Sequence, residues 1–495
     1  MSAAATLACY ITKRPVRFSI DLATNMKVAG RRFPILAKYK AGLNREGKMN
    51  VIDLDIYTDS GFHPSFIIGR LPQTLDQGYH IPNWHVVTTL VRTNKATAQA
   101  CRGPGAVPAS LIIESILEHA AKEVRMHPIL FKEIHLYEKG QTDLESIQLT
   151  HCTIRDVWQR LKQIAEVTER IKQTDQFNLN NKWRKRGITM CAVKFRILYY
   201  PPGHEVNISV FADDGTVTLM TSGVDMGQGL YTKVSQTVAR TLKVPLNYIK
   251  VRPLQNNTIP NPNFTGASFA TDTCVSAAIN ACRELNEKLE PLRAKMPDAD
   301  WPTLLKMCHF SNIDLSARAK SDKINDMFQY HTYCAAVVET EVDVLTGEYQ
   351  VKRVDIMAEI GESINPAIDI GQVEGAFTMG LGAYLSEDLH FDKKTGQVLN
   401  DGTWEYKPPT TKDIPIDWRI HFMPDTPNPV GVLNSKAVGE PPISLAVGAL
   451  LSIKSGVEAV REELTGERSF IPVEAPYTVE KVQLSTGINL EHLRV

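Results

Sequence analysis

The stretch KAVGEPP at residues 436–442 constrains the fold more than any other part of the sequence. It places Glu440 between a glycine and two prolines, and a long apolar run over residues 443–460 follows directly. Proline is favoured in the first turn of a helix, because its missing N–H group would be unpaired there in any case. We therefore expect Glu440 to lie at the start of a buried helix, on a backbone with little freedom to move.

Two interpretations of Glu440 follow from this position. A carboxylate that is held at a rigid, partly dry place suits a general base. An acidic residue at the start of a helix can also simply complement the positive end of the helix dipole, which is common. The heptapeptide alone favours the interpretation as a dipole-complementing residue. Other motifs in the sequence are needed to distinguish this interpretation from that of a general base.

The composition is that of an ordinary globular protein, with 495 residues of which 43% are hydrophobic and 22% charged. A chain of this length is expected to form about two to four domains. The 55 basic and 55 acidic residues balance, so net charge does not indicate binding to nucleic acid or to an acidic membrane. The N-terminus lacks the features of a signal peptide, and no uninterrupted apolar run reaches the roughly 18 residues of a membrane span. We expect a cytoplasmic protein.

The eight cysteines are scattered and contain no CxxC pair. The sequence therefore predicts neither a zinc site nor an iron–sulfur cluster. Reduced thiols are the expected state in the cytoplasm. The cysteines are Cys9, Cys101, Cys152, Cys191, Cys274, Cys282, Cys308 and Cys334.

Hydrophobic periodicity predicts an α+β fold rather than a doubly wound parallel sheet, because antiparallel hairpins are mixed with helices. A polar stretch rich in Asn and Lys, residues 173–186, is the expected linker between residues 1–172 and 187–495. Alternation predicts strands over residues 16–22 and 51–56 and hairpins that turn at Gly215 and Gly347. Apolar residues at helical spacing predict helices over residues 111–124, 154–165, 231–242, 273–289 and 443–464.

Three polar loops each run directly into one of these helices. The first is DMGQG at residues 225–229, whose glycines allow a ligand to approach the backbone closely. The second is TGASFAT at residues 265–271, where small hydroxyl residues can cap the helix or line an anion site. The third is the loop of Glu440. Each loop taken singly is better explained by a turn or a cap, but their recurrence indicates one shared binding site.

A nucleotide-binding loop is not encoded by these residues. The sequence contains no GxxxxGK[ST] motif. Gly227 and Gly229 also lack the third glycine of a dinucleotide-binding loop.

Taken in order, these loops closely resemble the molybdopterin-binding region of the xanthine dehydrogenase and aldehyde oxidase family. The resemblance covers nearly the whole chain, and its most specific motifs in combination are MGQG, NPAIDIGQVEG and SKAVGEPP. The matching stretches are RPVR at 14–17, YKAG at 39–42, CRGPG at 101–105, MGQG at 226–229, TGAS at 265–268, NPAIDIGQVEG at 365–375 and SKAVGEPP at 435–442.

The resemblance implies two elongated molybdopterin-binding domains and a reaction that hydroxylates aldehydes or N-heterocycles with oxygen from water. The metal would be held by the pterin, without a protein side chain as an equatorial ligand. Glu440 would be the catalytic base that generates the nucleophile. Residues that would contact the cofactor are Arg102, Met226, Gly227, Gln228, Gly229, Thr265, Ala267, Ser268 and Gln372.

The predicted substrate pocket departs from the family pattern. The family's substrate-orienting arginine, which marks purine oxidisers, falls at Leu22. This substitution predicts that xanthine is a poor substrate and that an aldehyde or an apolar heterocycle is preferred. The residues expected to line the pocket are Leu22, Pro104, Tyr199 and Tyr200, with further departures near the cofactor at Ala270 and Met379.

Other parts of the family pattern are not found in the sequence. The chain begins just after the point where the family carries a GGFGGK loop, and neither an iron–sulfur domain nor a flavin domain is encoded. Two hypotheses remain: a fragment of a molybdenum hydroxylase, which is either a truncated gene model or one half of a split enzyme, or a non-catalytic pseudoenzyme that binds a partner or nothing. The partners expected are a small aldehyde or heterocycle, a chain that bears Fe–S and FAD, and a second copy in a homodimer.

Overall fold

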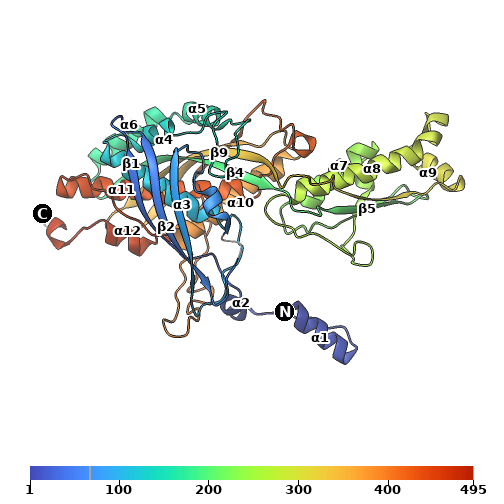
Figure 1. The fold of residues 1–495 in the computed structure, drawn as a ribbon, viewed down its shortest axis with the longest axis horizontal. Helices are drawn as coiled ribbons and strands as arrows, with labels where there is room; N and C mark the ends of the chain where they lie inside the picture. The colour runs from blue at the N-terminus through green and yellow to red at the C-terminus, as the bar shows by residue number, and fades with distance from the viewer. Residues whose placement is uncertain (66–68, 494–495) are drawn as a thin grey trace.

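The computed structural model describes residues 1–65 and 69–493 and has an α+β fold. Figure 1 shows a large body, with a smaller lobe of α7, α8, α9 and β5 projecting to one side. The N-terminal helix α1 (Ser2–Thr12) extends away from the body, and none of its residues is buried.

The strands of the described residues form three sheets. Their spatial orders are β1-β2-β3, β11-β10-β9-β4 and β7-β6-β5-β8. The first sheet contains β1 (Ile35–Leu43), β2 (Met49–Gly61) and β3 (Asn83–Arg92); the second contains β4 (Arg184–Leu198), β9 (Phe328–Asp343), β10 (Tyr349–Glu359) and β11 (Asp417–Phe422); the third contains β5 (Glu205–Val210), β6 (Val217–Thr221), β7 (Ile249–Val251) and β8 (Ser316–Lys320).

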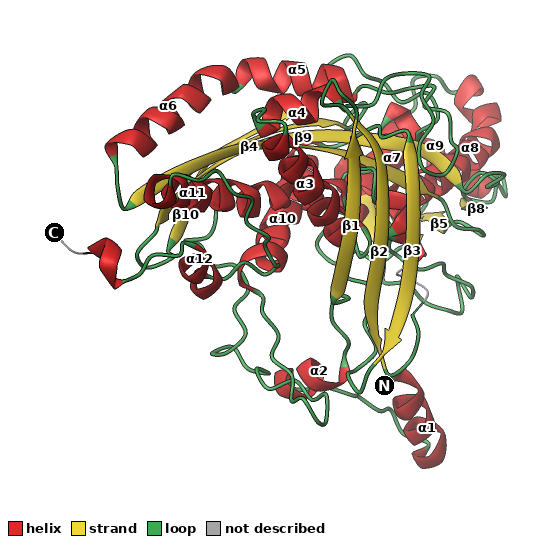
Figure 2. Cartoon of the chain, turned by 60° about the vertical axis from the view of Figure 1, so that its left-hand side comes forward, coloured by secondary structure: helices red, strands yellow, loops and turns green. Residues whose placement is uncertain are grey.

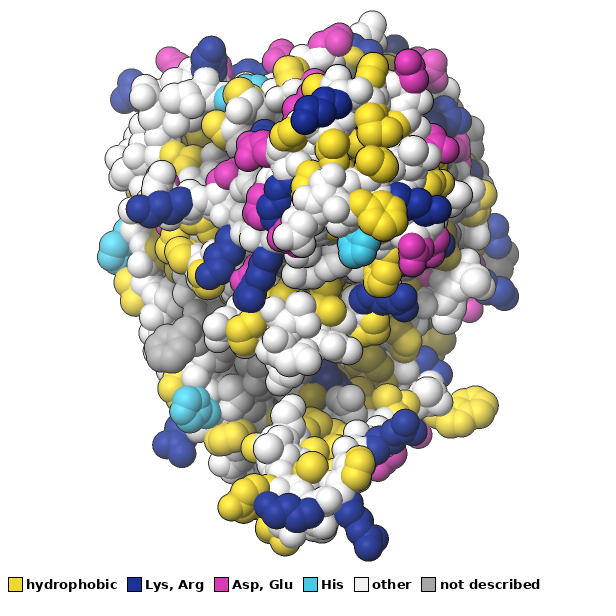
Figure 3. All heavy atoms as spheres, turned by 90° about the vertical axis from the view of Figure 1, so that its right-hand side faces the viewer, with side chains coloured by type: hydrophobic (Ala, Val, Ile, Leu, Met, Phe, Trp, Pro, Cys, Tyr) yellow, Lys and Arg dark blue, Asp and Glu magenta, His cyan; other side chains and the backbone are white. Residues whose placement is uncertain are grey.

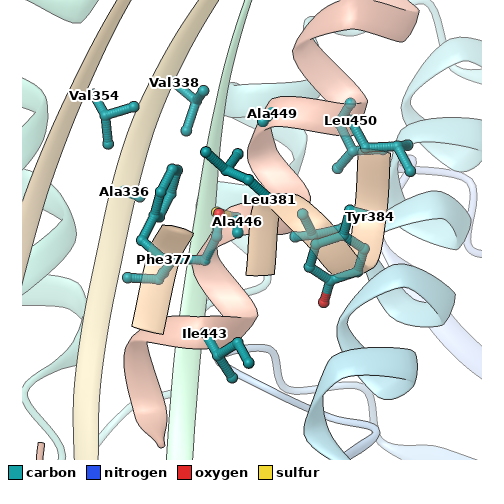
Figure 4. Packing of buried hydrophobic residues seen from close by; sticks show 14 of the residues in the cluster. Ala336, Val338, Val354, Phe377, Leu381, Tyr384, Ile443, Ala446, Ala449 and Leu450 are labelled. Carbon is teal, nitrogen blue, oxygen red and sulfur yellow. The ribbon is translucent and has the colours of Figure 1, made fainter. Parts of the chain in front are cut away.

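The second sheet is the centre of the body. The strands β9 and β10 form the hairpin expected at Gly347, whose φ of 80° favours glycine. The helical stretch after Glu440 begins as the 3-10 segment η6 (Pro441–Ala446) and continues as α11 (Val447–Thr465), which packs on β4 and β9. Figure 4 shows side chains of η6 and α11 meeting those of helix α10 (Pro366–Leu381) and of the sheet.

The first and second sheets are joined by one continuous core. Helices α3 (Ala106–Glu123), α4 (Pro128–Ile134) and α5 (Ile154–Ile164) contribute to this core together with Ile188 and Met190 of β4. The stretch 173–186, which was expected to be a linker, contains the end of α6 (Val167–Asn180) and the beginning of β4. The division into residues 1–172 and 187–495 stays a prediction.

Most of the elements expected from periodicity are confirmed. Helices cover each of the five expected stretches, and Gly215 turns the β5–β6 hairpin with a φ of 75°. The strand predicted over residues 16–22 is wrong: the chain there is irregular, and Asp21 caps α2 (Leu22–Val28) by accepting a hydrogen bond from Thr24 N. The lobe helices are α7 (Leu230–Leu242), α8 (Ala270–Lys295) and α9 (Trp301–Phe310), and α12 (Val479–Ser485) lies near the C-terminus.

The helical stretch Pro441–Thr465 is long and apolar enough to cross a membrane, alone among the helices of residues 1–65 and 69–493. However, 83% of its most apolar window is buried inside the protein. The core of the second sheet therefore accounts for its composition. On the face shown in Figure 3, basic and acidic side chains are interspersed, as the balanced composition leads one to expect.

Candidate functional site

A cavity of about 1030 Å³ brings together loops from most of the length of the chain. Arg102 and its neighbours come from the turn before α3, and Met226, Gly227 and Gln228 from the turn before α7. Glu440 enters from the start of η6. Thr265, Gly266, Ala267, Ser268, Gln372, Pro104, Tyr200, Ala270 and Met379 also line it. The convergence of the three polar loops is thus a feature of the structure.

Arg102 ties three of these segments together. Its Nε donates to Gly439 O at 2.5 Å, and its Nη2 donates to the backbone oxygen and to Oε1 of Gln372 at 3.0 and 3.1 Å. Gln372 lies on α10 and Gly439 directly precedes Glu440. A guanidinium can donate hydrogen bonds in several fixed directions, so Arg102 fixes the position of the Glu440 loop relative to α10.

The carboxylate of Glu440 contacts the Arg102 loop rather than its own helix. Its Oε1 accepts a hydrogen bond of 3.1 Å from Gly103 N, which lies in the loop before α3. No side-chain cap of η6 by Glu440 is formed. Glu440 therefore does not cap η6 through a side-chain hydrogen bond, whereas its complementation of the helix dipole stays an open interpretation.

The glycine-rich loop at residues 226–229 is held in shape by its own side chains. Gln228 Oε1 accepts from Met226 N at 2.6 Å, and its Nε2 donates to Val224 O at 2.8 Å. Thr265 Oγ1 accepts from Val224 N at 2.9 Å, which joins this loop to the next. Gly227 has a φ of 104° and open space where a side chain would be, so the backbone is accessible there.

The loop before α8 has an unusual backbone conformation. Ala267 and Ser268 have φ values of 49° and 61°, in the left-handed region that only a few per cent of non-glycine residues adopt. Ser268 Oγ is buried and has no hydrogen-bond partner among the described residues. A side chain on Gly439 would approach this oxygen to 2.9 Å, so Gly439 and Ser268 lie in close contact. The N-terminus of α8 also faces the cavity through Ala270, which favours an anionic ligand.

The cavity contains charged groups that the sequence analysis missed. Arg70 lines it and lies over the ring of Tyr200, with 5.1 Å from Cζ to the ring centroid. Burial lowers the pKa of Arg70, and the charge of Glu440 partly offsets this effect. Burial raises the pKa of Asp272 to about 6, against the hydrogen bonds that Tyr330 and Tyr199 donate to it.

The substrate-pocket residues are only partly brought together. Pro104 and Tyr200 line the cavity, and Tyr199 reaches it indirectly through its 2.8 Å hydrogen bond to Asp272. Leu22 is 53% exposed at the start of α2 and does not line the cavity. The structure does not bring Leu22 to this cavity, and the strand predicted around it does not form; its pocket role was assigned from its place in the family pattern. The exclusion of purines is no longer supported, since Arg70 presents a guanidinium inside the cavity.

Two other features alter the expected site. Gly229 does not line the cavity; it packs against Ile368 of α10, which a side chain at Gly229 would approach to 2.6 Å. Phe264 lines the cavity with its ring 5.4 Å from that of Tyr200, so two aromatic rings form part of its wall. Within residues 1–65 and 69–493, no group of three or more His, Cys, Asp or Glu side chains could hold a metal.

Family models and individual relatives of known proteins both match this chain over most of its length. Two models described as molybdopterin cofactor-binding domain match residues 1–136 and 160–415. The chain is 34% identical to xanthine dehydrogenase 1 of Arabidopsis thaliana and 32% identical to aldehyde oxidase 3 of Mus musculus, in each case over 98% of this chain and 37% of the relative. The chain thus spans little more than a third of the length of these relatives.

The fold is also found among solved structures. Quinoline 2-oxidoreductase from Pseudomonas putida 86 superposes with a TM-score of 0.84 at 19% identity, over 98% of this chain and 66% of that one. Identity this low supports the likeness of the folds alone.

Proposed function

The chain belongs to the molybdopterin-binding family that includes the xanthine dehydrogenases and aldehyde oxidases, and from this premise we propose that its cavity binds the molybdenum–pterin cofactor. We further propose that it forms the catalytic part of an oxidoreductase that hydroxylates aldehydes or N-heterocycles with oxygen from water. The observation that carries the proposal is the cavity itself, where Arg102, Gln228, Gln372 and Glu440 meet from distant parts of the chain.

The residues present fit an anionic ligand with many polar atoms. The buried Ser268 Oγ lacks a partner among the described residues, and the backbone at Gly227 is open to a close approach. Arg102 contributes positive charge, and the N-terminus of α8 adds the favourable end of a helix dipole. We propose that the cofactor is held by Arg102, Met226, Gly227, Gln228, Thr265, Ala267, Ser268 and Gln372.

When bound, the cofactor would supply the two-electron redox chemistry that the side chains lack. Glu440 is proposed to receive the proton that is released when the oxygen nucleophile forms. The N–H of Gly103 fixes Oε1 of this carboxylate, which leaves Oε2 to take the proton. Tyr200 and Phe264 would orient a flat substrate beside it.

The non-catalytic alternative has no specific observation in its favour. The cavity keeps the carboxylate of Glu440 in a defined geometry and keeps the amide of Gln228 in the glycine-rich loop. Because the relatives are much longer than this chain, we propose that its electrons pass to Fe–S and FAD groups on additional polypeptide, in the cytoplasm.

Metal and pterin analysis tests the proposal. Protein produced in cells that make the cofactor should contain molybdenum and pterin in a stoichiometric ratio to the chain. Gln372→Leu removes an oxygen that accepts from Arg102 and should lower both contents together, whereas Gln350→Leu on the exposed side of β10 should not. Wild-type protein that is folded but contains neither molybdenum nor pterin would refute cofactor binding.

Arg70 should determine the preference among substrates. Its guanidinium can donate two parallel hydrogen bonds to the polar edge of a heterocycle, which an aldehyde lacks. We expect Arg70→Met to lower kcat/KM for a carbonyl-bearing N-heterocycle by about 5–150-fold, equivalent to about 1–3 kcal/mol. For a simple aldehyde the change should stay within about threefold. An equal loss for both substrates, measured by steady-state kinetics, would contradict this role.

A further inference from the structure

A second cavity, of about 360 Å³, lies where α8 meets the start of β9 and the loop at residues 430–433. Figure 2 shows β4 and β9 running from the body towards α7 and α8 of the lobe. Of the residues that the structure describes, Asp272 alone lines both this cavity and the larger one. It lies in the first turn of α8 and is buried. Asp272 is therefore placed between the two cavities.

The two oxygens of the Asp272 carboxylate have different surroundings. Oδ2 accepts hydrogen bonds from the Tyr199 hydroxyl at 2.8 Å and from the Tyr330 hydroxyl at 2.6 Å. Oδ1 accepts none from a described residue. The two donors fix the carboxylate in place, and Oδ1 stays available to bind a proton.

A polar stripe on α8 leads from Asp272 to the protein surface. Three polar residues follow Asp272 at spacings of four, four and three positions, which places them on one face of the helix. They are Ser276, Asn280 and Arg283, and all three line the second cavity. Ser276 and Asn280 are half-buried, whereas Arg283 is exposed. The second cavity therefore forms a polar passage from Asp272 to the surface.

The groups around Asp272 bring its pKa close to neutrality. Burial raises this pKa to about 6, although the hydrogen bonds from the two tyrosines lower it. The charge of Lys233 on α7 also lowers it, and the charge of Asp369 on α10 raises it. Lys233 and Asp369 form an ion pair of 2.5 Å with each other, so their effects on Asp272 offset one another. A carboxyl group with such a pKa can both bind and release protons near neutral pH.

We propose that Asp272 passes protons from the larger cavity to water in the second cavity, a role that rests on the proposed hydroxylase function. Hydroxylation with oxygen from water balances only if two protons and two electrons leave for each substrate molecule. The electrons pass to the Fe–S and FAD groups proposed above. Glu440 lines the same cavity as Asp272 and receives the first proton. Oδ1 of ionised Asp272 then binds a proton on the side of the larger cavity and releases it to water beside Ser276, which restores the ionised form.

A purely structural role is the alternative for Asp272. The Tyr330 hydroxyl that donates to Asp272 also accepts a hydrogen bond of 3.0 Å from Ala437 N, in the loop of Glu440. Asp272 thus helps to fix this loop relative to α8. Asparagine keeps an oxygen that both tyrosines can donate to, but it cannot bind the proton. Asp272→Asn therefore separates the two roles.

The first experiment follows the protonation of Asp272 without any cofactor. Infrared difference spectra of the full chain should show a carboxyl group that titrates near pH 6. This signal should be missing in Asp272→Asn, whose Tm should stay close to that of the wild type. A wild-type spectrum without the signal, or a variant that retains it, overturns the inference.

The second experiment compares kcat among molybdenum-loaded samples. We expect Asp272→Asn to lower kcat by about tenfold or more. Acetate should restore part of this loss by carrying protons in place of the missing carboxylate, whereas potassium chloride at the same ionic strength should not. Ser276→Leu fills the second cavity, leaves Asp272 in place and should also lower kcat. Glu287→Gln, at an exposed position of α8, is the control and should keep the kcat of the wild type.

The outcomes distinguish the proton path from the proposed function. An unchanged kcat in molybdenum-loaded Asp272→Asn or Ser276→Leu overturns the proton path and leaves the proposed function in place. A loss in Asp272→Asn that acetate does not restore assigns this residue a structural role and overturns the proton path as well. A folded wild type without molybdenum refutes the proposed function, and the proton path with it.

Discussion

Replacing Glu440 with glutamine should reduce kcat of the cofactor-loaded protein by about 10²–10⁴-fold while leaving its molybdenum content unchanged. The amide can still accept the hydrogen bond from Gly103 N that orients the side chain. It cannot receive a proton, so only the proposed general-base step is lost. The rate is measured with an artificial electron acceptor, and the metal content is measured on the same sample.

Glu374→Gln provides the matched control for Glu440→Gln. Glu374 lies on α10, two residues from Gln372, but its side chain is exposed to solvent. Its variant should keep both the rate and the metal content of the wild type. If Glu440→Gln instead loses molybdenum in proportion to its activity, Glu440 is a structural part of the cofactor site and the base assignment fails.

Local signals in the sequence were sufficient to predict the meeting of the cavity loops. Glycines and prolines restrict the backbone through their own chemistry, so the turns before α7 and η6 could be predicted without knowledge of distant contacts. The helices after these turns carry regular apolar spacing, which specifies the face that each buries. Those two kinds of signal locate Gln228 and Glu440 at helix starts, where the structure has them.

Arg70 could not be assigned in the same way. It lies in a short segment without clear periodicity, and a distant contact holds it in place. A side chain on Gly105 would come within 2.8 Å of Leu71 N, so the segment reaches the cavity because residue 105 is a glycine. Leu22 was assigned to the pocket for a different reason, because it falls where the family carries its substrate-orienting arginine. The alternation before it suggested a strand, but Asp21 caps a helix that begins at Leu22.

The strand β4 was not predicted from the sequence, because it carries charged residues. Lysines in the polar stretch 173–186 suggested a linker. However, Lys185 in this stretch is buried, and so is Lys194 further along β4. Lys185 pairs with Glu463, and Lys194 lies 2.9 Å from Asp76. Partners far along the chain make burial of these charges tolerable, and no local pattern reveals such partners.

Replacing Lys132 with methionine should lower the free energy of unfolding by about 3–5 kcal/mol. Its side chain is fully buried and lies 2.8 Å from Glu114 Oε2 and 3.0 Å from Glu118 Oε1. It also donates to Met190 O of β4 at 3.1 Å, so it links the two halves of the core. Methionine fills a similar volume but leaves buried carboxylate charge without its partner. Urea unfolding followed by circular dichroism measures the loss.

A second substitution separates charge from packing in this network. Glu118 retains Lys454 at 3.3 Å when Lys132 is removed, whereas Glu114 is left uncompensated. Adding Glu114→Gln to Lys132→Met should therefore recover part of the loss, because the amide carries no charge into the core. Lys139→Met, at an exposed position, should change stability by less than about 0.5 kcal/mol. The loss of unfolding free energy in the double variant is compared with the sum of the losses in Lys132→Met and Glu114→Gln measured singly. If the two are equal, the cost comes from altered packing, and charge pairing does not stabilise the network.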